Sequence, residues 1–340
     1  MLSTIRPQAP THIDKLAHDK EDVASPQAEP LTVDELVRHR ASLGPSQPVV
    51  YYPRAGIEYS EFPLQHLDVF AYRVAKILAE KIPPRKSSSE CPAVVALLGP
   101  SNLDYLVLLL AVTKLGHAGL LLSTRISVEA HVSLIEGTNA QHMFVHGSLR
   151  DIAAKVNERV PTLQVHSIPS EENYDYHVPD EPIDTNLLSH LDPEVETNHL
   201  AWIIHSSGST GLPKPIFQTQ RAAVKNYAGN MNMRGFITLP LYHNHGICCL
   251  FRTIYSNKTL HLYNPQLPLT SRYLVEIMRS YNFEIFYGVP YALKLLAESE
   301  EGIEALAKLK AVMFGGSPCP DSLGNLLVEN GVNLIAHYGS

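Results

Sequence analysis

Short apolar runs alternate along the chain with longer segments in which apolar residues recur every three or four positions. The clearest runs are AVVALLG (93–99), HAGLLLS (117–123), HMFVHG (142–147) and LAWIIH (200–205). A short run that is apolar throughout is typical of a strand buried on both faces of a parallel sheet, and helical segments between such runs form the crossovers. The alternation continues toward residue 340 and predicts an α/β fold, with mostly parallel sub-sheets covered by helices.

The composition of the chain changes in two places. Residues 1–30 lack an apolar signal core and are rich in proline, alanine and charge, which favours a flexible extension. Residues 169–198 are acidic and rich in proline, as in a linker between two sub-sheets. The sequence therefore predicts an N-terminal extension over 1–30, a first α/β subdomain over 31–195 and a second over 196–340.

One apolar stretch, 103–122, approaches the length of a membrane span. It carries Asp104, Lys114 and His117 and is interrupted by the segment KLGHAG, which favours a buried helix, a turn and a buried strand. The net charge of -7 argues against a broad nucleic-acid surface. Four cysteines without CxxC spacing fit a reducing compartment, so we expect a cytoplasmic protein without membrane or nucleic-acid partners.

Residues 205–215, HSSGSTGLPKP, follow the apolar run AWIIH and combine small, hydroxyl and cationic side chains. Glycine lets successive backbone N–H groups turn toward an anion, hydroxyls add donors, and lysine adds a mobile positive charge. These glycines and donors are Ser206, Ser207, Gly208, Ser209, Thr210, Gly211 and Lys214. The composition predicts a loop that binds phosphate.

This loop does not match a P-loop NTPase, which has four residues between its glycines and then lysine and Ser/Thr at a helix start. Here two residues separate Gly208 from Gly211, and Pro213 precedes Lys214. The continuation PIFQTQ (215–220) is strand-like, so we expect a hairpin. A plain turn of small residues is the alternative that the residues leave open.

The segment IIHSSGSTGLPK (203–214) resembles the phosphate-loop signature of the adenylate-forming superfamily, which includes acyl-CoA synthetases, luciferases and the adenylation domains of nonribosomal peptide synthetases. Its extended form most resembles fungal synthetase-like enzymes that adenylate a carboxylic acid, pass it to a carrier thiol and often reduce it. Three further segments resemble superfamily motifs in the same order: LPLYHNHGI (239–247), VMFGGSPCP (312–320) and IAHYGS (335–340).

The resemblance implies roles for individual residues. His243 matches the position that borders the acyl pocket, and Lys214 matches a charge that could neutralise the leaving pyrophosphate, so both are candidate catalytic residues. The implied nucleotide contacts are Ser206, Ser207, Gly208, Ser209, Thr210, Gly211 and Lys214 in the phosphate loop, Gly315, Gly316, Ser317 and Pro318 in the adenine wall, and Ala336, His337 and Tyr338 beside it.

The implied reaction is attack of a carboxylate on the α-phosphorus of Mg·ATP, giving an acyl adenylate and pyrophosphate. The implied cofactors are ATP and Mg²⁺, with a phosphopantetheine thiol on a downstream domain, or CoA, as acceptor. The implied partners are a carboxylic acid and carrier or reductase domains of a longer polypeptide. No residue of this chain is assigned to a metal, because His243 and His245, two positions apart on an expected strand end, make a poor site.

Ser340 lies inside the segment that resembles the family motif YGxTE. In the family, the threonine and the Mg²⁺-binding glutamate of that motif, a ribose-binding aspartate and the lid lysine all come later. We therefore expect the 340-residue chain alone to be weak or inactive. The alternatives are a truncated acyl-CoA ligase and a non-catalytic remnant that binds nucleotide or a partner.

The segment 239–247 also bears on the substrate. Members of the family that activate α-amino acids carry an aspartate there to pair with the ammonium group, and here Asn244 takes that place. A buried ammonium group without a counter-charge is costly. An aryl, keto or aliphatic acid is therefore favoured over an α-amino acid.

Overall fold

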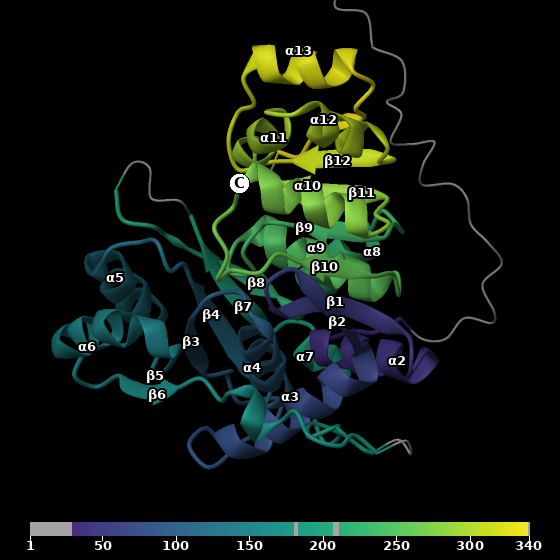
Figure 1. The fold of residues 1–340 in the computed structure, drawn as a ribbon. Helices are drawn as coiled ribbons and strands as arrows, with labels where there is room; N and C mark the ends of the chain where they lie inside the picture. The colour runs from purple at the N-terminus through teal and green to yellow at the C-terminus, as the bar shows by residue number, and fades with distance from the viewer. Residues whose placement is uncertain (1–28, 180–182, 207–210, 339–340) are drawn as a thin grey trace, which may run out of the picture.

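The computed structural model describes residues 29–179, 183–206 and 211–338, and the described strands form two sheets (Figure 1). The first sheet has the order β6-β5-β3-β4-β7-β8 and the second the order β13-β12-β11-β9-β10-β1-β2. Neighbouring strands are parallel except in the edge pairs β1–β2 and β7–β8. The expected α/β fold with mostly parallel sheets is confirmed.

The strands of the first sheet are β3 (Val94–Leu98), β4 (Ala118–Leu122), β5 (His142–Val145), β6 (Gln164–Ser167), β7 (Leu200–His205) and β8 (Pro215–Thr219). Those of the second are β1 (Pro48–Ala55), β2 (Glu58–Pro63), β9 (Gly235–Ile237), β10 (Leu260–Leu262), β11 (Ile285–Gly288), β12 (Ala311–Phe314) and β13 (Leu334–Ala336).

The helices before residue 200 are α2 (Val33–Leu43), α3 (Leu64–Leu78), α4 (Leu103–Lys114), α5 (Val128–Thr138), α6 (Arg150–Arg159) and α7 (Pro193–Glu196). Those after it are α8 (Gln220–Ala228), α9 (Asn244–Tyr255), α10 (Ser271–Ser280), α11 (Pro290–Leu296), α12 (Glu300–Ala307) and α13 (Asp321–Glu329).

Alternating residues of each strand face two different helical layers. On β3, Val95 and Leu97 pack with α2, α3, α4, α8 and α9, whereas Ala96 and Leu98 pack with α5 and α6. On β11, Tyr287 joins the first of these cores and Phe286 packs with α10, α11 and α12. One central helical layer therefore lies between the two sheets and is shared by both, and an outer helical layer covers each remaining face.

The two sheets exchange strands across the expected subdomain boundary. β1 and β2, from the first half of the chain, complete the sheet that contains residues 235–336. β7 and β8, from the second half, complete the sheet that contains residues 94–167. A subdomain boundary at 195/196 stays a prediction, but the hydrogen-bonded sheets do not separate there. Most of the expected extension 1–30 lies outside the described residues.

Several local expectations are refined by the structure. The apolar stretch 103–122 forms α4 and β4, as expected, and no helix of the described chain has the length and apolarity needed to cross a bilayer. Residues 244–255 and 58–63 form α9 and β2, outside the apolar runs that predicted the buried strands. Residues 291–309 contain the end of α11 and a separate helix, α12.

A buried charge cluster ties three helices of the central layer together. The Lys114 ammonium, 1% exposed, lies 2.9 Å from Asp34 Oδ1 on α2 and 2.5 Å from Asp68 Oδ1 on α3. Burial alone would lower the pKa of Lys114, but the two carboxylates raise it above its usual value. Thr185 donates to Asp68 Oδ2, so the linker before α7 joins the same cluster.

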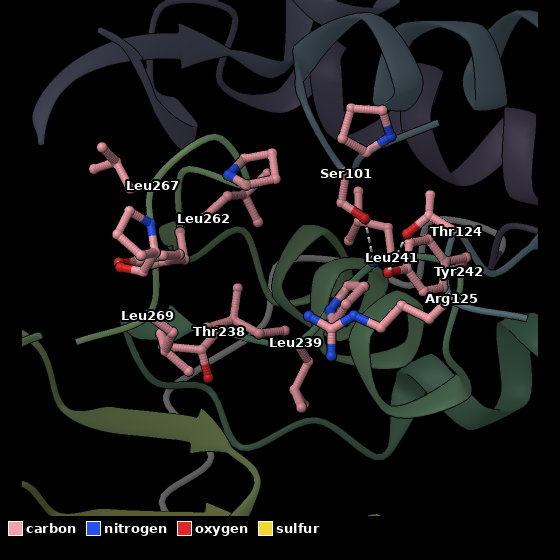
Figure 2. A pocket seen from close by; sticks show the side chains of 16 residues that line it. Ser101, Thr124, Arg125, Thr238, Leu239, Leu241, Tyr242, Leu262, Leu267 and Leu269 are labelled. Atoms are coloured by element: carbon pink, nitrogen blue, oxygen red, sulfur yellow. Dashed lines mark hydrogen bonds between the residues drawn. The ribbon is translucent and has the colours of Figure 1, made fainter. Parts of the chain in front are cut away.

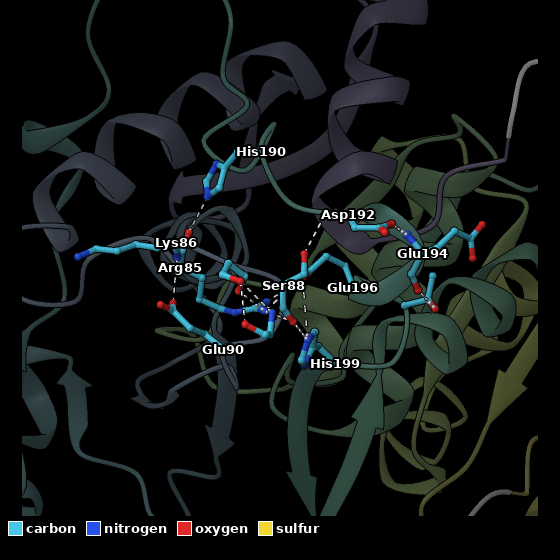
Figure 3. A network of polar contacts seen from close by, with 12 residues as sticks. Arg85, Lys86, Ser88, Glu90, His190, Asp192, Glu194, Glu196 and His199 are labelled. Atoms are coloured by element: carbon cyan, nitrogen blue, oxygen red, sulfur yellow. Dashed lines mark hydrogen bonds and ion pairs between the residues drawn. The ribbon is translucent and has the colours of Figure 1, made fainter.

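Polar contacts also pack the linker 183–199 onto the loop that precedes β3 (Figure 3). The buried Arg85 guanidinium donates to both carboxylate oxygens of Glu196, at 2.5 and 3.2 Å. The Arg85 carbonyl contacts His190 Nε2, and the Ser88 carbonyl contacts His199 Nε2. The acidic, proline-rich segment is therefore bound at several points to the loop that leads into β3 of the first sheet.

One buried histidine makes stability depend on pH. His261, on β10, stacks on Tyr51 at 4.2 Å, and neither of its ring nitrogens has a hydrogen-bond partner in the described part of the chain. Burial lowers its pKa to about 3. The unfolded chain takes up a proton near pH 6.5, whereas the folded chain does not until pH falls to about 3, so acid favours unfolding over that interval.

We expect His261→Phe to flatten the acid dependence of the unfolding free energy by about 1.4 kcal/mol per pH unit between roughly pH 6 and 4, because one proton is no longer taken up on unfolding. Urea titrations at several pH values measure this slope. The control is His177→Phe, at an exposed position. An unchanged slope in His261→Phe would show that this residue is not the neutral buried group.

Candidate functional site

The phosphate loop is the tip of a β-hairpin. β7 and β8 pair in antiparallel fashion, and Ser206 and Lys214 close the loop between them: Ser206 N donates to Lys214 O at 3.0 Å, and Lys214 N donates to Ser206 Oγ at 2.9 Å. Strand β8, rather than a helix, follows Lys214, which confirms the hairpin and the rejection of a P-loop. Ser207, Gly208, Ser209 and Thr210 lie outside the described residues, so their expected contacts stay predictions.

The segment 239–247 turns sharply from β9 into α9. An added Cβ on Gly246 would lie 2.1 Å from the Pro240 carbonyl oxygen, so only glycine fits this turn without a shift of the backbone. His243 occupies the N-cap position of α9, and His245 lies in its first turn. The expectation that these histidines lie on a strand end was wrong, because β9 already ends at Ile237 and the chain turns before the helix.

The surroundings of His243 favour a neutral imidazole. Partial burial lowers its pKa, and so do the nearby His205 and Arg125, although water screens part of the effect because the side chain keeps solvent contact. The next residue connects α9 to the hairpin, because the Asn244 side-chain oxygen accepts from Gln218 Nε2 on β8 at 3.0 Å. It also lies 3.3 Å from the Cys248 sulfur.

The expected adenine wall follows β12. Gly315 is buried, Gly316 has φ +87°, and Ser317 and Pro318 are exposed. An added Cβ on Gly315 would lie 2.6 Å from the His337 carbonyl oxygen. Ala336 pairs with Phe314 in the ladder between β12 and β13, and Tyr338 is 95% exposed. The turn after β12 and the residues after β13 therefore lie in direct contact.

His245 joins these two segments to α9. Its ring lies 4.7 Å from the ring of His337, and its Nδ1 would lie 3.3 Å from a Cβ on Gly315. Burial lowers the pKa of His245 to about 4, aided by His337 and Arg252. Among the described residues, no hydrogen bond or ion pair joins Ser206 or residues 211–214 directly to 315–318 or to 336–338. The hairpin instead contacts α9, through the bond between Gln218 and Asn244, and α9 contacts those two segments through His245.

A cavity of about 300 Å³ lies beside the segment 239–242, where the carboxyl ends of β3, β4, β9 and β10 meet (Figure 2). Leu241 N donates to Ser101 Oγ at 2.7 Å, and the Thr124 hydroxyl lies 3.2 Å from the Tyr242 hydroxyl. Arg125 is the cation of a lining in which polar and apolar surface are about equal. The sequence predicted no cavity at Ser101 and Thr124, although both follow apolar runs, and the carboxyl ends of parallel strands are where ligand-binding residues lie.

The pattern of the family described as "AMP-binding enzyme" matches residues 42–340 of this chain. The chain belongs to that family. Its relatives include an adenylate-forming reductase of Aspergillus terreus, 32% identical over 270 residues that cover 74% of this chain and 25% of the relative. A carboxylic acid reductase of Neurospora crassa is 28% identical over 88% of this chain and 30% of its own length. The chain thus spans about a quarter to a third of these AMP-binding relatives.

Solved structures of AMP-binding enzymes share the fold. The N-terminal domain of FACL13 from Mycobacterium tuberculosis superposes with a TM-score of 0.74 at 18% identity, covering 91% of this chain and 76% of that one. The anthranilate CoA ligase AuaEII in complex with anthranoyl-AMP gives a TM-score of 0.74 at 15% identity, covering 92% of this chain and 60% of that one. These likenesses confirm the two-sheet fold.

The described residues fit the nucleotide better than the metal. Lys214 and the hydroxyl of Ser206 stand at the mouth of the hairpin, where phosphate oxygens need donors. Within 29–179, 183–206 and 211–338, no group of three or more His, Cys, Asp or Glu residues could hold a metal ion. These residues therefore do not fit Mg²⁺ as a resident ion, and we derive no step through it.

The turn into α9 can be tested with two glycines in helices. Gly246→Ala should destabilise the fold by at least about 1 kcal/mol and shift the start of α9, because its methyl group would meet the Pro240 carbonyl. Gly324→Ala on α13, where nothing lies within 4 Å of an added Cβ, should stabilise by about 0.5–1 kcal/mol. Thermal unfolding compares them, and equal effects would contradict the close approach at Gly246.

Proposed function

We propose that this chain binds ATP and takes part in converting a carboxylic acid into an acyl adenylate. The proposal rests above all on one observation. Three segments far apart in the sequence, 243–247, 315–318 and 336–338, meet beside β8, the strand that follows the phosphate loop. Because the chain belongs to the AMP-binding family, we propose that the phosphates of ATP lie at Lys214 and its adenine at Gly315.

The proposed reaction has a simple electronic balance. A carboxylate oxygen attacks the α-phosphorus, a new P–O bond forms, and the bond to the β-phosphate oxygen breaks with its electrons leaving on pyrophosphate. Negative charge grows on phosphoryl oxygens, so positioned cations and donors do most of the catalysis. Lys214 and the hairpin hydroxyls would hold the leaving pyrophosphate. A protonated His243 would form an ion pair with the substrate carboxylate and hold it away from the phosphorus. A neutral His243 does not form this ion pair.

The substrate is proposed to be an aryl, keto or aliphatic acid. Asn244 is a neutral amide whose oxygen already accepts from Gln218, so it offers no counter-charge to an ammonium group. The names of the fungal relatives, an adenylate-forming reductase and a carboxylic acid reductase, agree with adenylation and later reduction of a carboxylic acid. We propose that the activated acid is transferred to a thiol between these steps. Carrier and reductase domains of a longer cytoplasmic polypeptide would carry out these steps.

The cavity beside 239–242 is proposed to admit the thiol-bearing arm of the acceptor, either phosphopantetheine on a carrier or CoA. Among the described residues, none from the hairpin or from the adenine wall lines it, so we treat it as a site of its own. Its mixed lining suits a slender arm that carries both amide groups and methylene groups, and Arg125 could pair with the phosphate of such an arm.

Lys214→Met should lower the affinity of the 340-residue chain for a fluorescent ATP analogue by about tenfold or more, since a charged contact to phosphate is lost. Lys225→Met, on the exposed side of α8, is the matched control. Equal affinity in both variants would contradict the role of Lys214. ATP–pyrophosphate exchange in the same samples tests turnover, and tight binding without exchange would support a nucleotide-binding role instead.

Leu267→Trp should fill the cavity and separate the two half-reactions. In the longest natural polypeptide that contains this chain, acid-dependent ATP–pyrophosphate exchange should stay within about threefold, while thioester formation should fall by about tenfold or more. Leu326→Trp, on the exposed face of α13, is the control. Loss of exchange in Leu267→Trp would place the acid, rather than the thiol arm, in this cavity.

A further inference from the structure

His205 is the last residue of β7 and stands directly before the phosphate loop. Its imidazole, 9% exposed, makes two hydrogen bonds whose directions are set by the partners. The backbone N–H of Ser123 lies 3.1 Å from Nε2, and the carbonyl oxygen of Ser206 lies 2.9 Å from Nδ1. Because an N–H can only donate and a carbonyl can only accept, His205 must be the neutral tautomer with its proton on Nδ1.

A second buried histidine contacts the same residue, Ser123, through the peptide group on its other side. His131, on α5, has its Nε2 3.0 Å from the Ser123 carbonyl oxygen, so this nitrogen carries the proton. Burial lowers the pKa of both His205 and His131, which keeps both rings neutral near physiological pH. Ser123 directly follows β4. The two rings therefore hold the end of that strand through the N–H and the carbonyl group of one residue.

Further contacts connect Ser123 to the segment that carries His243. Ser123 Oγ accepts from Arg125 N at 3.2 Å, which shapes the turn after β4. The residue between them, Thr124, lies 3.2 Å from the Tyr242 hydroxyl, and Tyr242 precedes His243. A continuous path of contacts therefore runs from the base of the phosphate hairpin to the segment that carries His243.

We propose that His205 is a positioning residue. By bonding to both Ser206 and Ser123, it fixes the end of β7, where the phosphate loop begins, relative to the end of β4. The role rests on the proposed function, since it requires that the hairpin bind ATP. Without these two hydrogen bonds the ends of β4 and β7 can move apart, and Lys214 is no longer held in a fixed position toward the phosphates. His205 touches no substrate in this role and acts through the backbone of Ser206 and Ser123.

Two substitutions at His205 separate its two hydrogen bonds. His205→Asn puts an amide donor near the place of Nδ1 and removes the acceptor for the Ser123 N–H. His205→Gln reaches further, so its side-chain oxygen can take the place of Nε2 and accept from Ser123. The control pair is His142→Asn and His142→Gln on β5, where the histidine contacts His166 in the same sheet.

The hydrogen bonds themselves are tested without nucleotide. In the 340-residue chain, long-range ¹H–¹⁵N spectra should show the Nδ1–H tautomer for His205 and the Nε2–H tautomer for His131. The Ser123 amide should exchange with solvent at least about tenfold faster in His205→Asn than in His205→Gln. An Nε2–H tautomer of His205, or equal exchange of the Ser123 amide in the two variants, would overturn the two hydrogen bonds of His205.

The positioning role is tested by nucleotide affinity. His205→Asn should weaken binding of the fluorescent ATP analogue about tenfold or more, whereas His205→Gln and both His142 variants should stay within about threefold of the wild type. In the longest natural polypeptide, the loss should appear mainly in the KM for ATP. Equal affinities of the Asn and Gln variants would overturn the positioning role while the wild type still binds ATP. Failure of the wild type to bind ATP would instead overturn the proposed function.

Discussion

The carboxyl ends of strands from two different sheets meet at one seam, and the arrangement of the site depends on that contact. The bond from Leu241 N to Ser101 Oγ and the approach of Thr124 to Tyr242 join loops after β3 and β4 to the loop after β9. Parallel sheets place all their connecting loops of one kind at the same edge. When two such edges face each other, residues from distant parts of the chain can act on one ligand.

The shared central layer of helices makes this seam rigid. The phosphate hairpin belongs to one sheet and the turn at Gly315 to the other, so their relative placement depends on the packing between the sheets. That packing includes the aromatic contact of Trp202 with Phe251 on α9, at 4.9 Å, and the buried Lys114 cluster that joins α2, α3 and α4. A core packed at crystal-like density transmits small shifts between the two parts of the site.

The histidines around the site contribute shape and hydrogen bonds rather than charge. Burial lowers the pKa of His205 and His245, and the two hydrogen bonds of His205 require a neutral ring. The positive charge that phosphate or a phosphorylated arm would meet comes instead from Lys214 and Arg125. The proposed binding surface is thus cationic, while the buried histidines beside it stay neutral near pH 7.

Local sequence determined what depends on neighbours along the chain. Apolar runs such as AVVALLG formed buried strands, and PIFQTQ after Lys214 formed the second strand of the hairpin, because periodicity and turn residues act over a few positions. Only the tertiary structure decided the rest. The joining of β1 to β10, the turn that Gly246 permits against Pro240, and the hydrogen bond between His205 and Ser123 all bring together residues whose meeting no local preference requires. These contacts exist because the two sheets bury a common helical layer.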